Sequence, residues 1–151
     1  MHIAELLHPL AARVTLGLFV LIWGSAVTAG LFADRELLAF IKEVVVWSLF
    51  PLVPIAMITA ITGLQLTRVR PSQISERKRR RLRLIAAISI VVLLPATLWL
   101  DAQAQQDSVD GTLFFIVQGI ELAAGLVTLV LMGISVRDGI LAKREAASAG
   151  R

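Results

Sequence analysis

The chain has 151 residues, of which 57% are hydrophobic and 17% are charged, and its formal net charge is +4 at pH 7. Soluble domains are about 45–50% apolar even when glycine is counted, so this composition predicts a membrane protein. The chain contains no cysteine, which excludes disulfides, thiolate metal sites and Fe–S clusters, and its length predicts a single domain without a separate soluble catalytic unit.

Four apolar runs divide the chain, and each approaches or exceeds the roughly 17–25 residues that cross a ~30 Å hydrocarbon core. They are Val14 to Ala33, Val44 to Leu66, Leu84 to Leu100 and Thr112 to Val136, with a basic loop over residues 67–83. An outward extension of the second run through Leu37 to Ile41 is the alternative for its start. The first run is longer than the apolar part of a signal peptide, so we expect an uncleaved span. None of the runs alternates as barrel strands do. The sequence therefore predicts an all-α integral membrane protein, folded as an antiparallel bundle of four transmembrane helices.

The basic residues are distributed unequally between the two sides of these spans. All Lys and Arg residues except Arg35 and Lys42 precede the first run, separate the second from the third, or follow the fourth. Cytoplasmic loops carry the excess of positive charge, so we expect both termini in the cytoplasm of a bacterial inner membrane. A basic cluster beside a span is typical of contact with anionic lipid head groups, rather than with nucleic acid. The residues expected to make this contact are Arg77, Lys78, Arg79, Arg80, Arg81 and Arg83.

Glu121 is the only charged residue in the fourth run. A charge in hydrocarbon costs about 2.5–3.5 kcal/mol on insertion scales, so this acid is expected to face protein or water. Gln118, which lies one helical turn away, is placed to donate a hydrogen bond to the carboxylate. Gln118 and Thr128 join Glu121 as candidates for binding a ligand or carrying a proton, and a purely structural glutamate is the alternative. The helical stripe that holds them also contains Phe114, Gly125 and Met132.

Two further side chains of the apolar runs have competing interpretations. Trp23 lies at the middle of the first run, where its indole either fills the core with its N–H bonded to a neighbour or forms a wall of a ligand cavity. Lys42 lies near the outer end of the second run, whereas Glu121 lies deep inside the fourth. A lysine side chain would not easily cover this difference in depth, so we expect Lys42 to extend to the membrane interface. Trp47 and Trp99 are expected at the outer interface as well.

Small residues predict which helix faces pack together. On the first run these residues are Gly17, Gly24 and Thr28, and on the third run the expected inward face contains Ala86, Ser89, Leu93 and Ala96. At the end of the fourth run, Arg137 and Gly139 are typical of a helix C-terminus, because a cation opposes the helix dipole and glycine suits the left-handed cap.

Sequence motifs for catalysis or cofactor binding are missing from the chain. Both histidines, His2 and His8, precede the first run, which argues against a bis-histidine haem between the spans and against zinc-protease chemistry. There is no phosphate-binding loop or nucleophile elbow. We predict no metal ligand and no catalytic residue, and the sequence leaves any cofactor undetermined.

The sequence favours an accessory or interaction protein whose partner is another membrane protein or a second copy of the chain. One alternative is a small-ligand or proton-coupled carrier that uses Glu121. The third is a membrane enzyme of lipid or quinone chemistry, which would have only carboxylates and hydroxyls as reactive groups.

Overall fold

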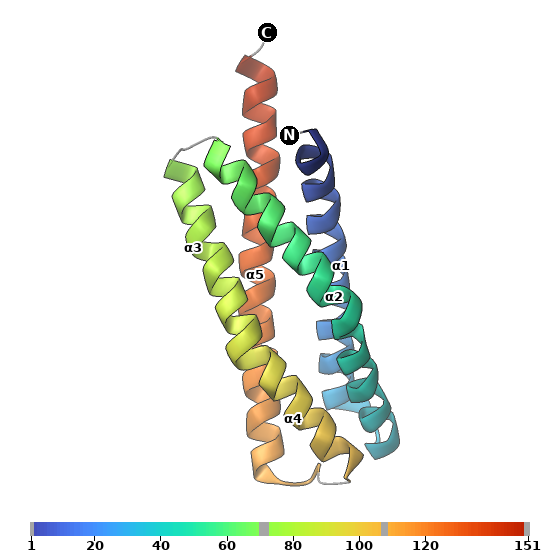
Figure 1. Cartoon of the computed structure of the whole chain (residues 1–151). Helices are drawn as coiled ribbons and strands as arrows, with labels where there is room; N and C mark the ends of the chain where they lie inside the picture. The colour runs from blue at the N-terminus through green and yellow to red at the C-terminus, as the bar shows by residue number, and fades with distance from the viewer. Residues whose placement is uncertain (1, 70–72, 107–108, 150–151) are drawn as a thin grey trace.

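The computed structural model describes residues 2–69, 73–106 and 109–149, and these ranges are almost entirely helical and contain no strand. The elements are α1 (His2–Phe32), α2 (Arg35–Val69), α3 (Gln73–Ile88), the π-helical turn η1 (Ser89–Leu93), α4 (Leu94–Gln105) and α5 (Thr112–Ala149). The helices α3 and α4 continue into one another through η1 and form one rod (Figure 1).

Four helical segments are long and apolar enough to cross a membrane, which confirms that part of the expected fold. They are His8–Phe32, Arg35–Gly63, Glu76–Gln105 and Thr112–Leu141. The second begins well before Val44, where the apolar run was expected to start. The third segment is longer than the apolar run from Leu84 to Leu100, which was short for a membrane span. The added length comes from the expected basic loop, because residues 73–83 are helical. Residues 70–72 of that loop lie outside the described residues.

The helices lie along a common long axis (Figure 1). One end of the molecule holds the connection between α1 and α2, the end of α4 and the start of α5, and we call it the Arg35 end. The other end holds the end of α2, the start of α3 and both chain termini, and we call it the terminal end. Helix α2 packs against α1 and α4, and α5 packs against α1, α3 and α4. Every long helix is therefore held by at least two others.

The buried core is concentrated toward the Arg35 end. Its apolar members are Ala29, Leu38, Leu100, Ala104, Val109 and Phe114. Small residues among them allow close approach of the helix backbones. Most of the large apolar side chains of the four segments point outward instead, among them Leu21, Phe50 and Val91. Such an apolar outer surface is suited to lipid or to other membrane helices.

Pro95 accounts for the π-helical turn. Proline has no N–H to donate and its ring collides with the preceding turn of an α-helix. The chain accommodates it by widening the turn before it, where the Leu94 N–H donates to the Ser89 carbonyl, five residues back. A wider turn rotates the residues that follow it relative to those before it. As a result the predicted inward face is wrong at Ala86, which is exposed, and the buried residues after the turn are Ala96, Thr97, Leu100 and Ala104.

The packing face predicted on α1 is also wrong. Gly17 and Thr28 are exposed, and a Cβ added at Gly17 or Gly24 would meet nothing within 4 Å. The side of α1 that is buried holds Thr15, Ala26 and Ala29. A small residue permits close packing but is equally acceptable when it faces lipid, so residue size alone does not choose the face.

Helix α5 does not end at Gly139. It continues to Ala149, and the residues after Gly139 include several strong helix formers, such as leucine, lysine, arginine and alanine. Asp138 pairs with Arg81 of α3, so this part of α5 packs against a neighbouring helix. The predicted helix C-terminus at Arg137 and Gly139 is therefore wrong.

Candidate functional site

A buried ion pair joins α2 to α5. Lys42 Nζ donates to Glu121 Oε2 over 2.7 Å, and the two side chains are 0% and 7% exposed. The expectation that Lys42 extends to the membrane interface is therefore wrong. Lys42 lies about 10 Å along α2 from Arg35, and Glu121 about 13 Å along α5 from Thr112, at 1.5 Å per residue. Both helices begin at the Arg35 end (Figure 1). The two residues therefore lie at similar depths, and the lysine side chain is long enough to reach the carboxylate.

Thr97 of α4 completes the environment of the carboxylate. Its Oγ1 donates to Glu121 Oε1 over 2.7 Å, and Thr97 is buried. Each carboxylate oxygen thus accepts a hydrogen bond from a different helix, and we call these three residues the Glu121 cluster. Hydrogen bonds to charged groups are stronger than neutral ones, so the cluster ties α2, α4 and α5 together. Sequence reasoning missed Thr97, although Pro95 beside it signalled an irregular turn.

The stripe predicted on α5 is buried over most of its length, because Phe114, Gln118, Glu121, Gly125 and Thr128 are buried and only Met132 is half-buried. The partners of its polar members differ from the prediction, however. No hydrogen bond joins Gln118 to Glu121 among the described residues. The Gln118 amide lies against Gly30 of α1, at the place that a Cβ there would occupy. Its Oε1 is buried and has no hydrogen-bond partner in the described part of the chain.

Trp23 and Thr128 both make hydrogen bonds within the bundle. The Trp23 indole N–H donates to the Leu122 carbonyl over 3.0 Å, and the ring lies directly over Gly125. Thr128 is fully buried, and its hydroxyl donates to the Ala124 carbonyl over 2.9 Å. The indole thus packs α1 against α5, because glycine leaves the space that the ring occupies.

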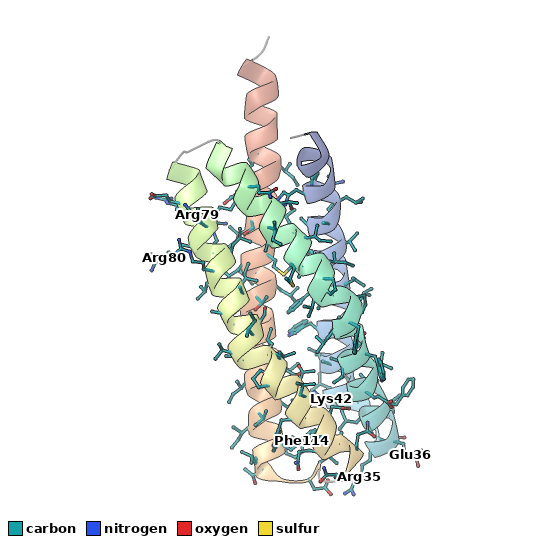
Figure 2. The ribbon with its side chains drawn as sticks, viewed as in Figure 1. Arg35, Glu36, Lys42, Arg79, Arg80 and Phe114 are labelled. Carbon is teal, nitrogen blue, oxygen red and sulfur yellow. The ribbon has the colours of Figure 1, made fainter. Side chains whose placement is uncertain are left out.

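The basic residues of α3 divide into two groups. Arg81 donates to Asp138 of α5 over 2.5 Å, with only 20% of its side chain exposed, so it contributes to helix packing. The exposed residues are Arg77, Arg80 and Arg83, while Lys78 and Arg79 are half-buried. Arg79 and Arg80 point outward from α3 near the terminal end (Figure 2). Contact of these residues with anionic lipid stays a prediction.

The described histidine, aspartate and glutamate side chains form no group of three or more that could hold a metal ion. His8 of α1 contacts the Thr62 hydroxyl of α2 over 3.0 Å, so it helps to pack the terminal end. No protein-family model, curated protein or solved structure matches this chain.

Proposed function

We propose that the chain is an integral protein of the bacterial inner membrane, that it crosses the membrane four times as an antiparallel bundle, and that both its termini are cytoplasmic. The four apolar helical segments support insertion. The basic residues of α3 lie toward the terminal end, and acidic residues such as Glu36 lie at the Arg35 end (Figure 2). The positive-inside rule orients such a molecule with the terminal end in the cytoplasm. Because Lys42 and Glu121 neutralise each other, they are easier to bury than two separate charges.

Single cysteines test this orientation, because the chain has no cysteine of its own. Glu36 and Arg77 are both exposed and lie at opposite ends of the molecule. A membrane-impermeant maleimide added to spheroplasts should label Glu36→Cys directly, and Arg77→Cys only after the membrane is permeabilised. Labelling of Arg77→Cys in intact spheroplasts would contradict the proposed orientation.

We further propose that the protein acts as an accessory subunit that binds a helix of another membrane protein through α2. The observation that carries this proposal is an exposed aromatic pair. The rings of Trp47 and Phe50 stack with centroids 5.4 Å apart, and the residues are 63% and 71% exposed. Both lie near the middle of the Arg35–Gly63 segment, whereas tryptophan in a lipid-facing belt lies near the ends of a span. Aromatic side chains are enriched among the residues that dominate binding at protein interfaces.

The Glu121 cluster weighs against the carrier alternative. A proton or ligand carrier needs an acid that exchanges with solvent, but the Glu121 side chain is only 7% exposed and Lys42 is not exposed at all. Both carboxylate oxygens already have protein partners. The cluster is suited to holding three helices in register, and this structural role is compatible with recognition of a partner through the outer surface.

Photo-crosslinking in native membranes tests the accessory role. Replacement of Trp47 by photoreactive benzoylphenylalanine should give a discrete adduct with another membrane protein. The matched control is the same replacement at Leu126, which is exposed at a similar depth on α5 and should give no discrete adduct. Trp47→Ala should remove the complex from a native gel with little change in melting temperature, because the side chain is mostly exposed. A monomer in native membranes and equal adducts at both positions would contradict the proposal.

A further inference from the structure

Helix α2 carries a carboxylate on its outer side, at a depth similar to that of the Glu121 cluster. Glu43 directly follows the buried Lys42 in the chain and is exposed. It lies about 12 Å along α2 from Arg35 at 1.5 Å per residue, which is close to half of a ~30 Å hydrocarbon core. Exposed apolar side chains lie on both sides of it along the helix, with Phe40 toward the Arg35 end and Phe50 toward the terminal end. In the proposed orientation, this carboxylate therefore faces the bilayer.

No cation in the described part of the chain neutralises Glu43. It belongs to none of the ion pairs found among the described residues, and none of their hydrogen bonds involves its carboxylate. The neighbouring cation, Lys42, is fully buried and is paired with Glu121. Ionisable side chains in membrane spans are rare, and they almost always pair with another group or face protein or water. An exposed acid at this depth is therefore expected to meet a cation from outside the chain.

The carboxylate lies on the same face of α2 as the exposed aromatic pair. Trp47 and Phe50 follow Glu43 by four and seven residues, and this spacing places three side chains in one row along a helix. A lysine or arginine side chain that pairs with a carboxylate is also attracted to the face of an aromatic ring, most strongly to that of tryptophan. The acid and the rings thus suit the same kind of partner.

A second copy of the chain is poorly suited to this face. Two copies related by a twofold axis bring identical surfaces together, so two Glu43 carboxylates would meet at the same depth. On the Arg35 side of the spans the sequence has only two cations, Arg35 and Lys42. Lys42 is paired with Glu121 and Arg35 with Asp110. The charge of this face therefore favours a different protein as the partner.

We propose that the face of α2 around Glu43 binds a transmembrane helix that carries a lysine or an arginine near the middle of its span. The proposal rests on the accessory role and names the chemistry of the partner helix. The Glu43 carboxylate pairs with the cation, and the rings of Trp47 and Phe50 pack beside it. One contact then removes both charges from lipid, so charge selects the partner and the aromatic area adds affinity.

Designed transmembrane peptides test this preference without the native partner. Two peptides share a leucine–alanine core of about 21 residues, long enough to span the bilayer, and differ only in a central lysine or leucine. The central position presents the lysine at one depth in either orientation of the peptide. The full chain, in lipid nanodiscs, carries a dye at Arg77→Cys, and energy transfer to a dye on the peptide measures binding. The lysine peptide should bind roughly ten- to a hundredfold more tightly, as for a hydrogen bond to a charged group.

Two variants of α2 locate the preference. Glu43→Gln removes the charge at nearly constant size, so it should weaken the lysine peptide about tenfold or more and leave the leucine peptide unchanged. Glu36→Gln is the matched control, because Glu36 is an exposed acid two helical turns away on the same side of α2. It lies at the Arg35 end (Figure 2), outside the apolar part of the helix, and its removal should keep the full preference.

The proposal is overturned if the unaltered chain binds both peptides equally. It is also overturned if Glu43→Gln keeps the preference for lysine, or if Glu36→Gln loses it. The native complex separates this proposal from the accessory role. A complex that forms through Trp47 and survives Glu43→Gln on a native gel would leave the accessory role standing and contradict recognition of a cation. A preference for the lysine peptide without any complex in native membranes would contradict the accessory role alone.

Discussion

Lys42→Met should lower the free energy of unfolding by about 3–5 kcal/mol, which is the usual cost of removing one partner from a buried ion pair. The variant keeps most of the length of the lysine side chain. It leaves the Glu121 carboxylate buried, with Thr97 as its one remaining partner among the described residues. The measurement is unfolding by steric trapping in bicelles, which reports free energy without removing the bilayer environment. Glu121→Gln should also destabilise the protein, because it leaves the Lys42 ammonium buried without a countercharge.

The double variant Lys42→Met with Glu121→Leu separates the cost of an unpaired charge from the value of the pair. Replacing both members of a buried pair by apolar residues is often neutral or stabilising, so the double variant should recover most of the stability lost in Lys42→Met. A loss below about 1 kcal/mol in Lys42→Met is typical of an exposed pair. Such a result would show that the pair is solvated and that Glu121 is accessible.

Gly125→Ala should lower the free energy of unfolding by about 1–3 kcal/mol, the usual range for overpacking a closed interface. A Cβ at Gly125 would lie 2.8 Å from the Trp23 indole nitrogen and would overlap a neighbouring ring carbon. The indole is also held by its hydrogen bond to the Leu122 carbonyl, so it cannot move aside without losing that bond. The same unfolding measurement in bicelles gives the size of the effect.

Gly133→Ala is the matched control on the same helix, because a Cβ at Gly133 would meet nothing within 4 Å. It should be neutral or should stabilise α5 by up to about 1 kcal/mol, since alanine is the better helix former. Equal destabilisation by the two variants would mean that Trp23 does not pack on Gly125.

We expect the Glu121 cluster to specify how α2, α4 and α5 align, whatever its net contribution to stability. Apolar faces of membrane helices are largely interchangeable, and α1 illustrates this because its small residues face outward. A lysine, a threonine and a glutamate that must meet at one depth exclude other rotations and other axial positions of α2, α4 and α5. Buried polar groups act in this way in some proteins, where they specify the register of helices.

The sequence by itself determined the features that depend on local pattern. The apolar runs identified the four helical segments that are long and apolar enough to cross a membrane, because hydropathy is summed along a single helix. The stripe of α5 through Gln118, Glu121 and Thr128 was found from helical spacing alone. The stripe was recognisable in the sequence because its polar residues differ clearly from the apolar residues on the opposite side of the helix.

Only the tertiary structure decided which groups meet. Lys42 lies deep in the bundle because α2 begins at Arg35. In the sequence, only the apolar residues between Arg35 and Lys42 indicated this early start of the helix. The position of Thr97 depended on the π-helical turn before Pro95, which breaks the regular spacing on which sequence patterns rely. The buried face of α1 depended on the shape of its neighbours, because a small residue fits equally well against lipid and against another helix. Pairing of side chains from different helices is a non-local property. It depends jointly on where each helix begins, how it is rotated about its axis and how deep each residue lies.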